Sequence, residues 1–139
     1  MEDCIFCKII RGEIPCVKVY EDDKVFAFED IHPISDGHTL IIPKNHFENI
    51  WEIEEDDLLA IHRASQKLCR AMTNALDVSG IAVLQLNGKS VNQMVLHYHL
   101  HLIPKMSDAP EIPLTNWELI EGDMDKIKQI GEKIAAAVE

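Results

Sequence analysis

Between residues 95 and 103 the chain alternates apolar and imidazole side chains, and this alternation restricts the fold more than any other feature. Histidine stands at positions 97, 99 and 101, with Tyr98, Leu100 and Leu102 between and after them. Successive side chains of a β-strand point to opposite faces, so a strand here carries three imidazoles on one face, about 6.5 to 7 Å apart, and apolar groups on the other. The pattern predicts a strand over residues 95–103, stopped by Pro104.

The rest of the chain predicts an α+β fold. Short apolar runs at residues 17–20, 25–28 and 39–42, and a buried strand at 81–86, complete an antiparallel sheet of about five strands. Residues 4–10 form a short apolar turn or helix, and the spacing at 124–138 predicts a C-terminal helix. One long amphipathic helix over 53–76 begins with acidic residues, which suit a helix N-terminus, and carries a stripe at steps of three and four: Leu58, Ile61, Ser65, Leu68, Met72 and Ala75.

Composition and charge narrow the class of protein. With 139 residues, 47% hydrophobic and 27% charged, the chain has the proportions of a single globular domain over 1–139. No apolar run approaches a membrane span and no secretory signal is visible at the start, so we expect a cytoplasmic protein without a membrane partner. The net charge of -11 argues against nucleic-acid polymers as partners, although backbone amides and imidazoles can still hold one small anion locally.

Three imidazoles in a row indicate chemistry at phosphorus or at a metal. Imidazole is both a nucleophile and a general acid near neutral pH, so neighbouring histidines can divide the two tasks in phosphoryl or nucleotidyl transfer. Alternate strand positions can equally supply three ligands to a catalytic zinc ion. The spacing alone does not separate these two interpretations.

The chain resembles the histidine triad (HIT) family, whose signature is His-x-His-x-His followed by two apolar residues. Here that signature is the segment 97–103, and the resemblance extends over 4–105, leaving 106–139 as a C-terminal helical segment. It includes residues 4–10 with 12–15, Asp30 ahead of Pro33, residues 37–44 with His46, and Asn87 ahead of Gln93. The chain is most similar to the branch of nucleoside phosphoramidases.

This resemblance implies a mechanism. His99 would attack the α-phosphorus of a purine nucleotide and form a nucleotidyl-histidine, which water would hydrolyse without any cofactor. His101 would contact the phosphate and protonate the leaving group, the carbonyl of His97 would accept the second proton of His99, and His38 would support the cluster. The substrate would be a nucleoside monophosphate of either purine, linked through a P–N bond. A dinucleoside polyphosphate hydrolase and a purine-nucleotide binding module with weak turnover stay open as alternatives.

The same resemblance assigns the nucleotide contacts. Asn87 and Gln93 would contact the phosphate or the bridging atom, and Asp30 would accept hydrogen bonds from the ribose hydroxyls. Two positions depart from the family pattern, because Met94 stands where a hydroxyl residue is common and Asn92 where glycine is frequent. An apolar slot would hold the base, lined by Ile5, Phe6, Ile9, Phe28 and Ile31.

Cys4 and Cys7 form a C-x-x-C pair, which is typical of a metal clamp or a redox site. The resemblance completes a zinc site with His46 and His97. Such a Cys2His2 set is closed, so the zinc would be structural and would tie the N-terminal segment to the sheet without activating water. A pair of buried thiols is the alternative.

Family members of this size resemble two-fold homodimers. The long helix and the strand at 81–86 would each meet their copies and continue the sheet across the interface. The C-terminal segment would then shape the substrate pocket of the partner subunit, with Trp117 near the leaving group.

Overall fold

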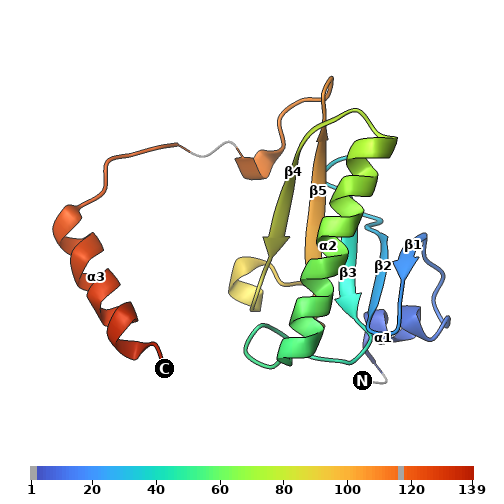
Figure 1. The fold of residues 1–139 in the computed structure, drawn as a ribbon, viewed down its shortest axis with the longest axis horizontal. Coiled ribbons are helices and arrows are strands. Elements are labelled where there is room, and N and C mark those ends of the chain that lie inside the picture. The colour runs from blue at the N-terminus through green and yellow to red at the C-terminus, as the bar shows by residue number, and fades with distance from the viewer. Residues whose placement is uncertain (1–2, 116–117) are drawn as a thin grey trace.

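Five antiparallel strands in the order β1-β2-β3-β5-β4 form the framework of the computed structural model, which describes residues 3–115 and 118–139 (Figure 1). The strands are β1 Lys18–Glu21, β2 Val25–Glu29, β3 Thr39–Pro43, β4 Val78–Gln85 and β5 Leu100–Met106. The helices are α1 Ile5–Ile10, α2 Glu55–Ala75 and α3 Met124–Ala137, with 3-10 turns η1 Lys89–Val91 and η2 Pro113–Thr115. The predicted α+β class and the five-stranded antiparallel sheet are confirmed.

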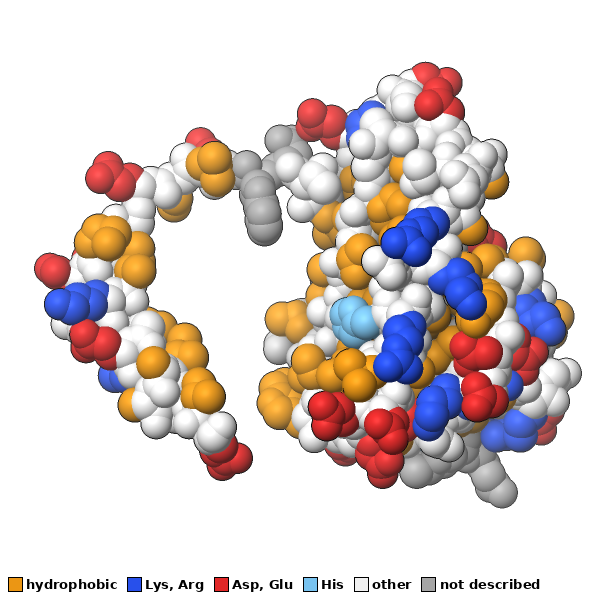
Figure 2. Space-filling view, viewed as in Figure 1, with side chains coloured by type: hydrophobic (Ala, Val, Ile, Leu, Met, Phe, Trp, Pro, Cys, Tyr) orange, Lys and Arg blue, Asp and Glu red, His pale blue; other side chains and the backbone are white. Residues whose placement is uncertain are grey.

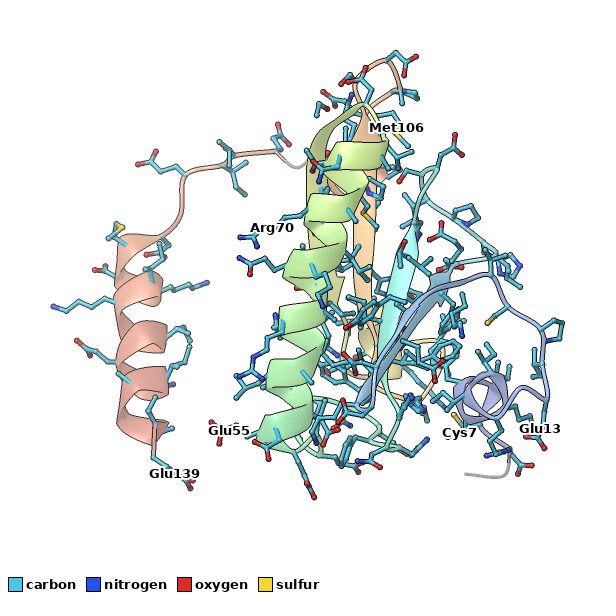
Figure 3. All side chains as sticks on the ribbon, turned by 45° about the vertical axis from the view of Figure 1, so that its right-hand side comes forward. Cys7, Glu13, Glu55, Arg70, Met106 and Glu139 are labelled. Atoms are coloured by element: carbon cyan, nitrogen blue, oxygen red, sulfur yellow. The ribbon has the colours of Figure 1, made fainter. Side chains whose placement is uncertain are left out.

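The two faces of the sheet pack against different helices. Alternate side chains of β2 divide between them, since Val25 and Ala27 join the α2 core whereas Phe26 and Phe28 join the α1 core. Figure 3 shows α1, which carries Cys7, and α2 on opposite sides of the strands. Because Leu100 and Leu102 of β5 face α2, His101, the histidine of the same strand, faces the α1 side.

Helix α2 has the predicted bounds to within two residues and buries four of the six residues of the predicted stripe, whereas Leu58 is partly buried and Ala75 is exposed. Ile61 is fully buried, and Leu68 and Met72 are almost so. The acidic residues of its first turn, Glu55, Asp56 and Asp57, lie where the helix dipole favours negative charge.

The prediction for the triad strand was wrong at both ends. Strand β5 begins at Leu100, so His97 and His99 precede it, and it continues past Pro104 to Met106. The ladder between β3 and β5 stops at the pair of Thr39 and Leu102, so Pro104 lies beyond the end of β3. On that side the carbonyl of Pro104 accepts a hydrogen bond from Ser35 Oγ at 2.6 Å, and the proline is tolerated there. The N and O atoms of a strand residue point to the same side, so the missing N–H removes no bond to β4.

The strand predicted at 81–86 forms, but the prediction that it is buried was wrong. Strand β4 starts earlier, at Val78, and lies at the edge of the sheet with only partial burial. Val83 is 51% exposed. A short apolar run is compatible with either a central strand or an edge that a neighbour covers, and the sequence does not separate the two.

Helix α3 forms where the spacing predicts it, but it packs against nothing in the described chain. Met124, Ile127, Ile130 and Ile134 are all more than half exposed, and the helix stands apart from the sheet (Figure 1). None of the helices in the described part of the chain combines the length and apolar character needed to cross a membrane. Trp117 lies outside the described residues.

Candidate active site and metal site

Three of the predicted catalytic histidines form one cluster on the α1 face of the sheet. The ring centroids of His99 and His101 are 5.0 Å apart, and those of His38 and His101 are 5.2 Å apart. His38 is placed by its position just before β3, and Gly37 before it has a φ of 90°, a conformation that favours glycine. A Cβ at Gly37 would also lie 2.9 Å from Pro104 Cγ.

Hydrogen bonding sets the tautomer of His99. Its Nδ1 lies 2.7 Å from the carbonyl oxygen of His97, and a carbonyl can only accept, so Nδ1 carries the proton. In the neutral ring the lone pair is therefore on Nε2. Because His99 is only 5% exposed, this lone pair is largely desolvated and has a defined direction.

The pair His38 and His101 is ordered in the same way. The backbone N–H of Ile34 donates to His38 Nδ1 at 3.1 Å, so His38 carries its proton on Nε2. That N–H donates to His101 Nδ1 at 2.9 Å, which leaves a proton on Nε2 of His101. Asp30 Oδ2 lies 3.5 Å from His38 Nε2 and stabilises any positive charge on this pair. His101 can thus donate a proton from Nε2.

A three-histidine metal site does not form. Of the metal-compatible groups among the described residues, one contains His97 and another contains His38, His101 and Asp30, but neither contains His99. In the second group, a metal on His38 Nε2 would require the proton to move to Nδ1, where it would oppose the N–H of Ile34. The tautomers therefore favour proton transfer over metal binding.

Burial keeps these imidazoles neutral at pH 7. It lowers the pKa of His101 to about 4, with the neighbouring His99 and His38 adding to the effect. Burial also lowers the pKa of His99 and of His38, although Asp30 opposes it in both. A neutral His99 retains the lone pair that a nucleophile needs.

The predicted base slot divides into a buried floor and an exposed rim. Phe6 packs edge-on against His99, with ring centroids 5.2 Å apart, and so joins the slot to the catalytic cluster. Ile5 is 51% exposed and Ile31 80% exposed, and both are available to a ligand. The other three members, Phe6, Ile9 and Phe28, belong to the α1 core.

The loop that precedes the histidines is held by two side-chain amides. Gln93 is 1% exposed, and it accepts from the N–H of Gly88 at 2.7 Å and donates to the carbonyl of Glu48 at 2.6 Å. Asn87 exchanges two hydrogen bonds with Gln85 and accepts from the N–H of Ile50 at 2.8 Å. In this structure Gln93 shapes the loop, whereas Asn87 retains one N–H of its amide for a ligand.

The two departures from the family pattern have different consequences. Asn92 has a φ of 69°, and asparagine is one of the few side chains that adopts this left-handed conformation, so it replaces a glycine at low cost. Met94 is 83% exposed and offers only a thioether, which is a weak acceptor.

The predicted zinc ligands converge on one point. Cys4 Sγ lies 3.4 Å from His97 Nδ1, and Cys7 Sγ lies 3.4 Å from His46 Nδ1 and 3.6 Å from His97 Nδ1. Zn–S bonds of about 2.3 Å and Zn–N bonds of about 2.05 Å in a tetrahedron give S–N edges of roughly 3.5 Å. His97 Nε2 donates to the carbonyl of Pro43 at 2.9 Å, which leaves Nδ1 free to bind.

The electrostatics favour a metal over a redox pair. Burial, with a smaller effect of Cys4, raises the pKa of the Cys7 thiol to about 11. A redox-active cysteine needs a lowered pKa, whereas a metal ion deprotonates its thiol ligands directly. Cys4, Cys7, His46 and His97 could therefore hold a metal ion, and the residues fit one in both distance and chemistry.

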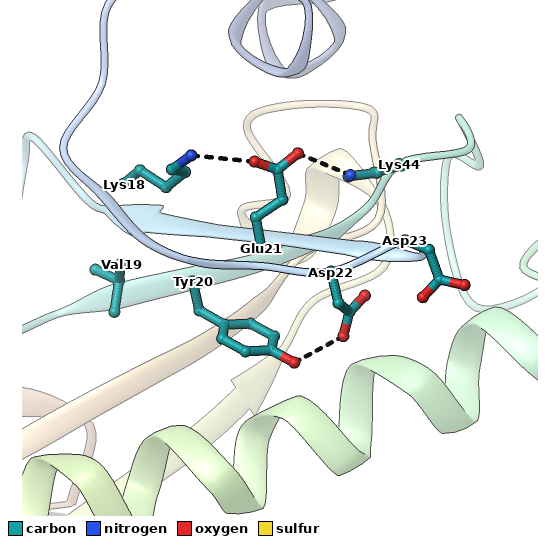
Figure 4. A pocket seen from close by; sticks show the side chains of 7 residues that line it. All are labelled: Lys18, Val19, Tyr20, Glu21, Asp22, Asp23 and Lys44. Carbon is teal, nitrogen blue, oxygen red and sulfur yellow. Dashed lines mark hydrogen bonds and ion pairs between the residues drawn. The ribbon is translucent and has the colours of Figure 1, made fainter.

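The side chains that line a hollow of about 630 Å³ beside β1 pair mainly with one another (Figure 4). Glu21 pairs with Lys18 at 3.1 Å and with Lys44 at 2.7 Å, and the hydroxyl of Tyr20 donates to Asp22. These groups satisfy one another. A second hollow, of about 570 Å³, borders Cys4 and His46 at the metal site.

The resemblance implied the carbonyl of His97 as the partner of His99, but sequence reasoning missed two other backbone groups that orient imidazoles. The carbonyl of Pro43 and the N–H of Ile34 each decide the tautomer of one histidine. Their residue types carry no signal, because every residue offers a carbonyl and every residue but proline an N–H.

Comparison with known proteins agrees with this geometry. The family model of the HIT domain matches residues 11–108. The chain belongs to the HIT family. It is 46% identical to Protein hit of Bacillus subtilis over 104 residues (75% of this chain, 72% of that protein) and 41% identical to the adenosine 5'-monophosphoramidase of Candida albicans over 135 residues (94% and 88%).

The fold of this HIT protein matches solved structures of the family. A HIT family protein of Bacillus anthracis superimposes with a TM-score of 0.85 at 36% identity, covering 99% of both chains. That coverage includes the region of α3. Relatives named phosphoramidase, adenylylsulfatase and HIT family hydrolase support a hydrolase.

We predict that acid destabilises this cluster. The folded-state pKa of His101, about 4, lies below the ordinary value of 6.5, so the unfolded chain binds more protons between these pH values. The free energy of unfolding should therefore be highest above pH 6.5 and fall as the pH drops toward 4. His101→Gln should reduce this slope by at most about 1.4 kcal/mol per pH unit, measured by urea unfolding. The exposed His62→Gln is the control, and an unchanged slope in His101→Gln would contradict the prediction.

Proposed function

We propose that this HIT protein hydrolyses phosphoramidate-type derivatives of purine nucleoside monophosphates through a nucleotidyl-histidine intermediate. The observation that carries the proposal is the 2.7 Å hydrogen bond from His99 Nδ1 to the carbonyl of His97, which leaves Nε2 as the nucleophile. The relative in Candida albicans named an adenosine 5'-monophosphoramidase supports the class of substrate.

The chemistry takes two displacements at one phosphorus. His99 Nε2 bonds to the α-phosphorus, the P–N bond to the leaving amine breaks, and the amine takes a proton from His101. The anionic phosphate raises the proton affinity of His101. In the complex His101 is therefore a protonated imidazolium, whereas in the free protein it is neutral. Water then attacks the phosphorus, its proton passes to His101, and His99 leaves as neutral imidazole. The products are the amine and a nucleoside monophosphate.

The nucleotide would lie between α1 and the loop after β4. Asp30 would accept hydrogen bonds from the ribose hydroxyls, and Asn87 with nearby loop amides would contact the phosphate. Gln93 would act by holding that loop. The base would enter the apolar slot, whose exposed rim is Ile5 and Ile31 and whose floor is Phe6, Ile9 and Phe28.

A zinc ion would be held by Cys4, Cys7, His46 and His97. When bound, it would supply structure and no chemistry, because four protein ligands leave no position for water. The reduced thiols that it needs fit a cytoplasmic location, where disulfides are rare.

We further propose a two-fold dimer. The edge strand β4, with Val83 half exposed, would pair with its copy and continue the sheet. Figure 2 shows hydrophobic side chains on the side of α3 that faces the body and others along the facing edge of the body. A second subunit would cover both sets, and α3 would then reach the partner's surface.

We predict His99-dependent release of AMP from adenosine 5'-phosphoramidate. Because His99 forms the covalent bond, His99→Ala should lower kcat by more than about a thousandfold, whereas the exposed His62→Ala should not. Mass spectrometry of the wild type after a denaturing quench at alkaline pH, where the P–N bond of the adduct is stable, should detect the nucleotidyl adduct. Cleavage of diadenosine tetraphosphate alone would favour the polyphosphate hydrolase. Tight AMP binding without turnover of either compound would favour the binding module and contradict the proposal.

Purified protein should contain about one zinc per chain by elemental analysis. Cys7→Ser removes a buried ligand and should abolish the zinc content, whereas Cys69→Ser, which alters a cysteine outside the cluster, should leave it unchanged. Less than about a tenth of an equivalent in unchelated wild-type protein would refute the zinc site.

The mass in solution at micromolar concentration should be that of two chains. Val83→Asp places a charge at the β4 edge and should weaken the dimer by at least about tenfold, which corresponds to 1.4 kcal/mol. Val19→Asp introduces the same charge at the opposite edge, on β1, and should have no effect. Sedimentation analysis that finds a wild-type monomer would overturn the dimer.

A further inference from the structure

The peptide group between His97 and Tyr98 orients the nucleophile, yet the sheet does not hold it. Strand β5 begins at Leu100, so this peptide lies outside the ladder. Its carbonyl accepts from His99 Nδ1 at 2.7 Å, and its N–H donates to the carbonyl of Phe47 at 2.6 Å. Other contacts must therefore fix the plane of this peptide.

The peptide and its hydrogen-bond partner are each covalently next to a residue of the Cys/His cluster. His97 itself lies at one end, and its side chain is buried completely between the two cysteine sulfurs and the carbonyl of Pro43. On the other side, Phe47 directly follows His46. The hydrogen bond from the N–H of Tyr98 to the carbonyl of Phe47 therefore joins the residues that directly follow His97 and His46. The rings of these two histidines lie edge to face, with centroids 4.8 Å apart.

We infer that the Cys4–Cys7–His46–His97 cluster acts as a clamp on the His97–Tyr98 peptide and thereby aims His99 Nε2 at phosphorus. His97 is in this sense a positioning residue, because its side chain belongs to the cluster while its carbonyl holds the nucleophile. The inference rests on the proposed function in taking His99 as the nucleophile. It goes beyond a structural metal site in linking occupancy of the cluster to the rate of the chemical step.

Cys4→Ser tests the clamp with little damage to the fold. Cys4 is the N-cap of α1, where its Sγ accepts from the N–H of Cys7, and serine is among the preferred N-cap residues. The variant removes a metal ligand while it keeps the cap. The experiment compares three samples: wild-type protein loaded with zinc, the same protein after chelation, and Cys4→Ser. Cys16→Ser, which alters a cysteine outside the cluster, is the control.

In the chelated protein and in Cys4→Ser, kcat for adenosine 5'-phosphoramidate should fall about tenfold to a hundredfold. KM and the Kd for AMP should change less than about twofold, since the nucleotide contacts remain. At fixed pH, the imidazole ¹⁵N spectrum should change from a single Nδ1–H tautomer of His99 to a mixture. Circular dichroism confirms that each sample is folded, and if chelation unfolds the protein, Cys4→Ser carries the comparison.

Two results would overturn the clamp. One is a folded, metal-free Cys4→Ser protein with unchanged kcat and an unchanged His99 spectrum. The other is a parallel loss of kcat and AMP affinity, which indicates general loosening of the site. If zinc-loaded wild-type protein has no His99-dependent turnover, the proposed function fails instead, and the ¹⁵N spectrum still tests the clamp by itself.

Discussion

Burial of the apolar face of β5 against α2 is the constraint on which the rest of the structure depends. Leu100 and Leu102 join a core with Ile61 and Leu68 of the helix, and this contact fixes which face of the strand is inside. A slip of one residue would turn the leucines away from α2 and move the histidine of the strand into the core. Hydrophobic packing on one side of the sheet therefore determines that chemistry occurs on the other.

Desolvation then gives the imidazoles their roles. The rings are buried beside α1 and stay neutral, so each ring has one donor and one acceptor nitrogen, and its tautomer decides which is which. Fixed backbone groups make that choice: the carbonyl of His97 for His99, the N–H of Ile34 for His38, and the carbonyl of Pro43 for His97. One residue type thus offers a free imidazole lone pair on His99, a hydrogen-bonded pair in His38 and His101, and a candidate metal ligand in His97.

The N-terminal segment contributes to both sites. Helix α1 places Cys7 in the metal cluster and Phe6 against His99, so a helix of six residues joins the two. Such a short helix is not stable alone, and its stability comes from packing on the sheet and from the ligands it supplies. The apolar residues around Phe6, the ring of His99 and the Cys/His cluster are therefore parts of one packed unit.

The sequence by itself predicted the α+β class and the long helix, because hydrophobic periodicity is a local property, whereas the candidate residues of both sites came from the resemblance to the HIT family. It did not determine the limits of β5, since Pro104 is tolerated only where β3 has ended, nor that β4 is an edge strand with Val83 exposed. Only the tertiary structure decided that His97 turns away from His99 and His101 toward the cysteines. The tautomer of His97 likewise depends on the carbonyl of Pro43, a backbone group of a distant segment, and such groups leave no trace in residue type.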